Sequence, residues 1–141
     1  MSKLSLIGYV KNSNFGPYWV PMRYQNQLLK IYCESKKKLF HLPMAEPYFL
    51  KNYIQLNTVN KIINKNLGIV TLSLHMMPSN KDKRQNFFKS VIEKKSQIHF
   101  VFENIILKDE KTLQDIEKHI KIINFFNMSQ KIFLKIKKLN N

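Results

Sequence analysis

The sequence predicts an α/β (α+β) protein, a two-layer sandwich with helices on one face of a mainly antiparallel sheet. Segments in which apolar and polar residues alternate are typical of strands. They are interleaved with segments whose apolar residues recur every three or four positions, which is typical of helices. The 141 residues are enough for one domain with a modest core and too few for two. We therefore expect a single domain over residues 1–141 with a ferredoxin-like arrangement.

The expected elements follow this patterning along the chain. The predicted strands are residues 3–10, 69–77, 97–107 and 131–139, with an uncertain further strand at 48–56. The predicted helices are residues 20–38, residues 80–95 and a third that opens at Asp109. Ser79 stands three residues before Asp82, which is the spacing of a helix-capping pair. Pro43 and Pro47 favour extended chain, so we expect a long loop or insertion over about residues 41–68.

The chain is strongly basic, and this charge limits the class of partner. It holds 24 Lys and Arg against 9 Asp and Glu, for a net charge of +15. Such an excess repels itself in the folded state and suits a polyanion, either nucleic acid or an anionic membrane. Arg23 and Arg84 are the only arginines, and Ala45 is the only alanine. This composition is typical of AT-biased coding, so part of the charge records codon drift rather than function.

Several function classes find no support in the sequence. Cys33 is the only cysteine, which excludes a disulfide framework within the chain and indicates a reducing compartment. The four histidines lack zinc spacing, the three glycines are too far apart for a phosphate loop, and the acidic residues form no acid–base pattern. We therefore expect no enzyme activity, no cofactor, no metal and no small-molecule substrate. No stretch of about 18 apolar residues predicts a membrane span, and the first residues lack a signal-peptide pattern.

The candidate functional residues are basic side chains near predicted helix ends. Lys81, Lys83 and Arg84 crowd the first turn of the predicted helix 80–95, where the helix dipole disfavours cations. An anionic partner would offset this cost, and Arg84 is suited to bind a phosphate with two hydrogen bonds. A lysine run and one histidine flank the predicted long loop; a solvated helix end is the alternative interpretation of that run. The predicted RNA-binding residues are Lys36, Lys37, Lys38, His41, Lys81, Lys83 and Arg84.

Four segments resemble the family of the tenth small-subunit ribosomal protein, also known in bacteria as NusE. They are Leu42-Pro43 in a long loop, Asn80-Lys81-Asp82-Lys83-Arg84 after an apolar strand and a proline, Glu110-Lys111-Thr112 at a helix start, and the final strand at 132–139. Met77-Pro78-Ser79 departs from the Ser-Pro-His-like turn of the family, and the loop is longer than expected. The resemblance covers residues 69–139, and the first half of the chain by element order.

This resemblance implies a structural constituent of the ribosome. A protein of the small-subunit head would bind ribosomal RNA by neutralising phosphates and would contact neighbouring small-subunit ribosomal proteins. The AT-biased composition favours an organelle-encoded protein of the mitochondrial matrix, in a mitochondrial ribosome. The alternative is the cytoplasm of a low-GC bacterium.

Two other classes stay open at this stage. A soluble accessory subunit of an organellar membrane complex would need an amphipathic surface helix with basic flanks. The best candidate, residues 111–126, instead carries Asp115 and Glu117 on its polar side. A DNA-binding or transcription-accessory module would need Arg, Asn or Gln on the outward face of a helix. Gln85 and Asn86 are present but adjoin the apolar face, which counts against this class. Because of the acidic side chains in residues 111–126, we also expect no membrane partner.

Overall fold

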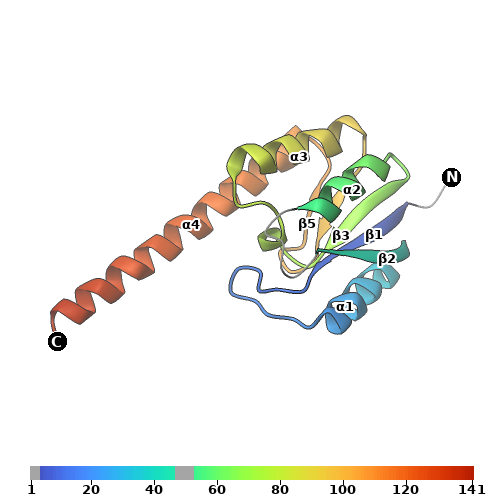
Figure 1. Cartoon of the computed structure of the whole chain (residues 1–141). Helices are drawn as coiled ribbons and strands as arrows, with labels where there is room; N and C mark the ends of the chain where they lie inside the picture. The colour runs from blue at the N-terminus through green and yellow to red at the C-terminus, as the bar shows by residue number, and fades with distance from the viewer. Residues whose placement is uncertain (1–3, 47–52) are drawn as a thin grey trace.

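The computed structural model describes residues 4–46 and 53–141. Its strands are β1 (Ser5–Lys11), β2 (Leu39–Glu46), β3 (Leu67–Thr71), β4 (Ile98–Phe100) and β5 (Ile105–Leu107). Its helices are α1 (Met22–Ser35), α2 (Ile54–Ile62), α3 (Lys81–Glu93) and α4 (Glu110–Leu139), with a 3-10 turn η1 (Leu74–Met76) after β3 (Figure 1). The prediction of a mixed α/β protein is confirmed.

The sheet is mainly parallel, so the prediction of a mainly antiparallel sheet is wrong. The strand order is β2-β1-β3-β4-β5, and only the β4–β5 pairing is antiparallel. A helix follows each of β1, β2 and β3, and a helical crossover returns the chain to the same edge of the sheet, where it starts a parallel strand. Only residues 101–104, between β4 and β5, are short enough for a hairpin. This order differs from the ferredoxin-like arrangement expected from the sequence.

Helices cover both faces of the sheet, which gives three layers where two were expected. Helix α1 lies on one face, and α2 and α3 lie on the other (Figure 1). Strand β2 lies on one side of β1 and β3 on the other, so the winding direction reverses between them, as in doubly wound sheets. Five consecutive residues of β1 are buried, because helices shield both of its faces.

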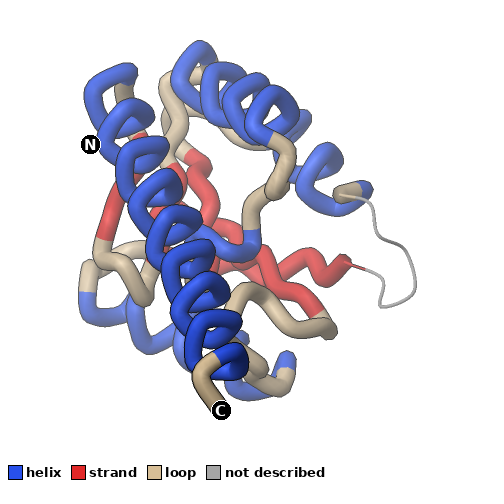
Figure 2. Tube along the Cα trace, turned by 90° about the vertical axis from the view of Figure 1, so that its left-hand side faces the viewer, coloured by secondary structure: helices blue, strands red, loops and turns tan. Residues whose placement is uncertain are grey.

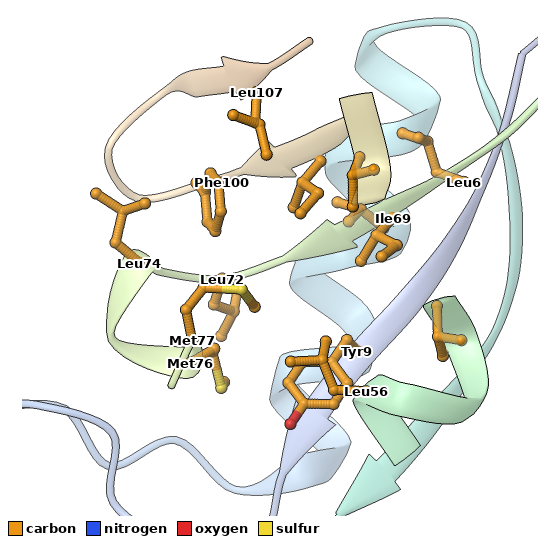
Figure 3. Packing of buried hydrophobic residues seen from close by; sticks show 14 of the residues in the cluster. Leu6, Tyr9, Leu56, Ile69, Leu72, Leu74, Met76, Met77, Phe100 and Leu107 are labelled. Atoms are coloured by element: carbon orange, nitrogen blue, oxygen red, sulfur yellow. The ribbon is translucent and has the colours of Figure 1, made fainter. Parts of the chain in front are cut away.

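The core lies between these layers. Figure 3 shows Leu6, Ile69 and Phe100 from three neighbouring strands together with Leu56 of α2, all completely buried. Phe88 of α3 packs edge-on against Phe100, with ring centroids 6.3 Å apart. This packing fixes α3 over the centre of the sheet.

The predicted helices are confirmed where caps and periodicity agree. Helix α1 lies within the predicted range 20–38, and α3 begins one residue after its cap. The cap is Asn80 rather than Ser79, because the Asn80 side chain accepts a hydrogen bond from the Lys83 backbone N–H at 2.9 Å. Asp109 opens α4 in a capping box with Thr112, as its position predicted.

Between residues 39 and 107 the predicted elements need correction. The segment predicted as a long loop contains β2 and α2; residues 47–52 of that prediction lie outside the described residues. The predicted strand 69–77 ends at Thr71 and continues into η1, while 97–107 is a hairpin of two short strands. Asn104, at φ 54°, makes the sharp turn between those two strands.

The last predicted strand, residues 131–139, is instead the end of the 30-residue helix α4. Ile132, Leu134 and Ile136 alternate with other residues, but Phe125, Phe126 and Phe133 also follow helical spacing with them. No glycine or proline interrupts residues 110–139, so nothing in the chain ends the helix earlier.

Candidate nucleic-acid interface

Arg84 is buried and bound within the protein. Its Nε and Nη2 donate to the two carboxylate oxygens of Glu117, each at 2.8 Å, and Nη1 donates to the carbonyls of Pro78 and Ser79, each at 3.1 Å. Only 6% of the residue is exposed. The structure therefore does not support the prediction that Arg84 contacts phosphate, because all three guanidinium nitrogens already have acceptors. Arg84 ties α3 to α4.

Lys81 and Lys83 remain exposed at the start of α3. Their unfavourable position on the helix dipole is partly offset by Asp82 in the same turn and by the Asn80 cap. Lys81 also lines a groove of about 560 Å³ between α3 and α4. The other lysines that line this groove are Lys89, Lys118 and Lys121. The dipole argument alone thus gives weaker support for an anionic partner here than the sequence suggested.

A second group of lysines gathers at the opposite end of the sheet. We call this end the amino edge, because β1, β2, β3 and β4 begin there and the antiparallel β5 ends there. Three lysines precede β2, one lies in the connection to β3, two lie in the connection to β4, and one follows β5. Of the two before β4, Lys94 is half-buried and donates a hydrogen bond to the Asn60 carbonyl, so only the exposed Lys95 is counted in this group. These amino-edge lysines are Lys36, Lys37, Lys38, Lys65, Lys95 and Lys108.

Strand register brings these connections to one edge. Ser5 of β1 lies opposite both Leu39 of β2 and Leu67 of β3, and Ile98 of β4 lies opposite Leu107 of β5. With neighbouring strands about 4.8 Å apart, the five strand ends span roughly 19 Å. Lysines far apart in sequence therefore share one strip of surface. Lys38 is half-buried, and the other five are exposed.

Two of these lysines occupy backbone positions that favour glycine. Lys37 has φ 57° and Lys95 has φ 56°, each one residue past the C-cap of a helix. In both cases the N–H groups of this residue and the next bond back to the last helical turn, as in a Schellman motif. A lysine at such a position costs stability relative to glycine.

The pKa of His99 in β4 is affected by two of the amino-edge lysines. Burial first, and then the charges of Lys38 and Lys36, together lower its pKa to about 4. Its Nδ1 forms a hydrogen bond with the Tyr32 hydroxyl at 2.8 Å. His99 is therefore neutral at physiological pH and fixes α1 against the sheet.

The amino-edge lysines are free to meet an external anion. Among the described residues the one ion pair is Arg84–Glu117, so none of these lysines is neutralised by a carboxylate within hydrogen-bonding distance. Asp109 stands next to Lys108, but its carboxylate accepts the Thr112 backbone N–H at 2.8 Å. The Thr112 backbone and side-chain hydrogen bonds lower the pKa of Asp109 and commit it to the α4 cap.

The structure divides the predicted site residues between two ends of the molecule. Lys36, Lys37 and Lys38 lie at the amino edge, and exposed His41 lies about 7 Å further along β2. Lys81 and Lys83 follow β3, so they lie at the opposite end of the parallel strands. Lys65, Lys95 and Lys108 were not predicted as site residues, because Lys65 and Lys108 each stand alone in a connection and Lys95 has only Lys94 beside it.

A buried polar cluster at the ends of β1 and β2 holds these strands and α2 together, and it has no evident role in binding. Glu46 accepts hydrogen bonds from the Tyr9 hydroxyl at 2.9 Å and from the Leu56 backbone N–H at 3.0 Å. These bonds link β1, β2 and the start of α2. Burial, followed by the nearby Glu46 charge, raises the pKa of Tyr9, which keeps this hydroxyl protonated as a donor.

Catalytic and metal-binding chemistry gain no support from the described part of the chain. There, no group of three or more His, Cys, Asp and Glu side chains is placed to hold a metal ion. Burial raises the pKa of the Cys33 thiol to about 11, which disfavours the nucleophilic thiolate. No helix within residues 4–46 and 53–141 has the length and apolarity to cross a membrane.

Comparison of the sequence with models of known protein families and with curated proteins gives no match.

Proposed function

We propose that this protein is a non-catalytic RNA-binding protein that uses its amino-edge lysines to neutralise RNA phosphates. The observation that carries the proposal is the convergence of exposed lysines from separate connections on one edge of the sheet. Phosphate neutralisation by lysine gives affinity without base-specific contacts, which suits a structural role.

The uneven distribution of lysine argues against codon drift as its cause. Residues 12–20, 72–80 and 101–104, the connections that leave β1, β3 and β4 at the opposite edge, contain no lysine or arginine. The exposed lysines at that end, Lys81 and Lys83, lie in the first turn of α3. The connection after β2 lies partly outside the described residues. Drift acts on codons without regard to strand ends, whereas a polyanion partner would retain lysine at one edge.

Favourable interaction with helix dipoles is the main alternative explanation for these lysines. Lysines at the ends of α1 and α3 do lie near the negative ends of those helices. However, that benefit is available to any lysine in the last turn. Lys37 and Lys95 instead occupy positions of positive φ, where a glycine would fold more favourably. External binding gives a reason to keep lysine there.

The specific form of the proposal is a structural component of the small ribosomal subunit, in contact with ribosomal RNA and neighbouring proteins. The AT-biased composition supports a mitochondrial location. The segments 80–84 and 110–112 still support the resemblance to the tenth small-subunit protein family. The helix at 131–139 and the parallel sheet remove two other supports, so the proposal depends mainly on the amino edge.

RNA-binding measurements on two charge-matched variants test this function. One variant carries Lys37→Glu, Lys65→Glu and Lys95→Glu, and the control carries Lys81→Glu, Lys83→Glu and Lys89→Glu on α3. We expect the amino-edge variant to lose on the order of 100-fold in affinity for single-stranded RNA, and the control to lose much less. Equal losses would overturn the proposed interface, and equal affinity for duplex DNA would overturn the preference for RNA.

Sedimentation of an organelle or cell extract tests the ribosomal form separately. We expect the protein to co-migrate with the small ribosomal subunit. Migration with a membrane complex, or as free protein, would contradict this form while leaving RNA binding to be judged by the variants.

A further inference from the structure

The distal segment of α4, residues 122–139, extends beyond the folded domain and carries an exposed apolar face. Figure 1 shows this segment projecting away from the sheet, and Figure 2 views the molecule from the side toward which it projects. Eight apolar side chains that lie along one face of it are each more than half exposed. They are Ile122, Phe125, Phe126, Met128, Ile132, Phe133, Ile136 and Leu139.

This apolar face points away from the domain. In the proximal part of α4, Leu113 and Ile116 are buried, and Ile120 packs against the same core. At about 100° per residue, the distal apolar face is centred roughly on the opposite side of the helix from these three residues. The face covers an arc of roughly 160°. A partner that covers this face must therefore approach the side of the helix that points away from the domain.

The charges of the distal segment are all positive and favour an anionic partner. No Asp or Glu follows Glu117. On the helix, Lys135 and Lys137 border the apolar face, and Lys131 and Lys138 lie behind it. A second copy of this chain would bring two such lysine sets together without any carboxylate to offset them. Self-pairing of the segment is therefore disfavoured.

We propose that the distal segment binds the surface of an anionic lipid bilayer, with the domain held on the water side. A basic helix with Phe and Ile on a wide apolar face lies in the plane of the interface, and bordering lysines reach the lipid headgroups. An RNA surface offers little apolar area to this face, and a protein groove is usually filled by a narrower ridge at i, i+3, i+4 and i+7. This inference does not depend on the proposed RNA binding.

The structure also explains why the sequence disfavoured a membrane partner. The best amphipathic segment in the sequence pattern, residues 111–126, carries the acidic side chains of the proximal part of α4, and that pattern predicts a strand at residues 131–139. With the helix continued to Leu139, the basic amphipathic segment starts after those acidic residues. The helix rests on the bilayer, because within the described residues none is suited to span it.

Vesicle flotation of the full chain tests this proposal. The vesicles contain either phosphatidylcholine alone or equal parts of phosphatidylcholine and phosphatidylserine. We expect binding only to the anionic vesicles. Phe133→Gln, on the apolar face, should weaken that binding on the order of 10-fold, because a large side chain no longer enters the interface. The control Leu134→Gln removes a neighbouring apolar side chain that is also more than half exposed but lies off that face, and it should change the binding less than about twofold.

Several outcomes would overturn the proposal. They are the absence of binding to anionic vesicles, equal binding to phosphatidylcholine alone, or equal effects of the two variants. Phe133→Gln should leave RNA affinity and helical content unchanged, which separates this test from that of the amino edge. A large loss of RNA affinity in Phe133→Gln would instead assign the distal segment to RNA.

Discussion

Replacing Lys37 and Lys95 with glycine is expected to make the protein more stable and a weaker RNA binder at once. Both lysines have positive φ, at 57° and 56°, in the turns that end α1 and α3. Glycine adopts this conformation without the steric cost that a side chain pays, so each replacement should add about 1 kcal/mol to the free energy of unfolding. Because the two turns belong to different helices, the double variant should gain about 2 kcal/mol.

The same double variant should show a weaker salt dependence of RNA binding. Each lysine that neutralises a phosphate of single-stranded RNA contributes about 0.7 to the slope of log affinity against log salt concentration. Loss of both contacts should therefore lower the slope by about 1.4. Urea unfolding measures the stability, and RNA titrations at several salt concentrations measure the slope.

A matched control separates charge from backbone conformation. Alanine at Lys37 and Lys95 removes both charges but keeps a side chain at positive φ, so RNA binding should fall as it does with glycine. Stability should then show no comparable gain. If the glycine variant bound RNA with unchanged affinity and salt slope, Lys37 and Lys95 would not contact RNA, and this result would contradict the proposed interface.

Three further predictions concern the frame that holds the interface. Because His99 takes up a proton at about pH 4 when folded and near pH 6.5 when unfolded, the free energy of unfolding should fall by about 3 kcal/mol as pH drops through that window. His99→Gln should remove this fall in urea titrations at several pH values; an unchanged pH dependence would contradict it. Arg84→Met should destabilise by about 3 kcal/mol, because the Glu117 carboxylate loses its partner, yet leave RNA affinity unchanged; a loss of affinity would return Arg84 to the interface. Gly16→Ala should cost about 2 kcal/mol in thermal unfolding, because a side chain at φ 59° would meet the His75 ring; a neutral result would contradict this contact.

Local signals in the sequence predicted α1, α3 and the start of α4, but they missed α2 and the end of α4, and they did not predict partners across the fold. Arg84 shares a helix face with Phe87 and Phe88, which pointed to burial, while its charge pointed to exposure. Its partner Glu117 lies 33 residues away, and only the packing of α3 against α4 brings the two together. That pairing depends on tertiary structure, which neither periodicity nor capping encodes.

The interface could be predicted only in part, because its lysines come together through the parallel direction of the strands. The lysine run before β2 was recognised because three charges stand together in sequence. Lys65 and Lys108 stand alone and Lys95 is one of a pair, and they lie near the run only because a parallel sheet brings successive strand starts to one edge. An antiparallel sheet would have distributed the same lysines over both ends.

A lysine-reactivity footprint of the full chain with and without single-stranded RNA tests directly whether the amino edge binds RNA. Acetylation of exposed lysines, mapped by mass spectrometry, reports which of them the RNA covers. We expect RNA to protect Lys36, Lys37, Lys65, Lys95 and Lys108, while Lys81 and Lys83 at the opposite end stay reactive. Protection centred on Lys81 and Lys83, or spread evenly over all exposed lysines, would contradict an RNA-binding amino edge.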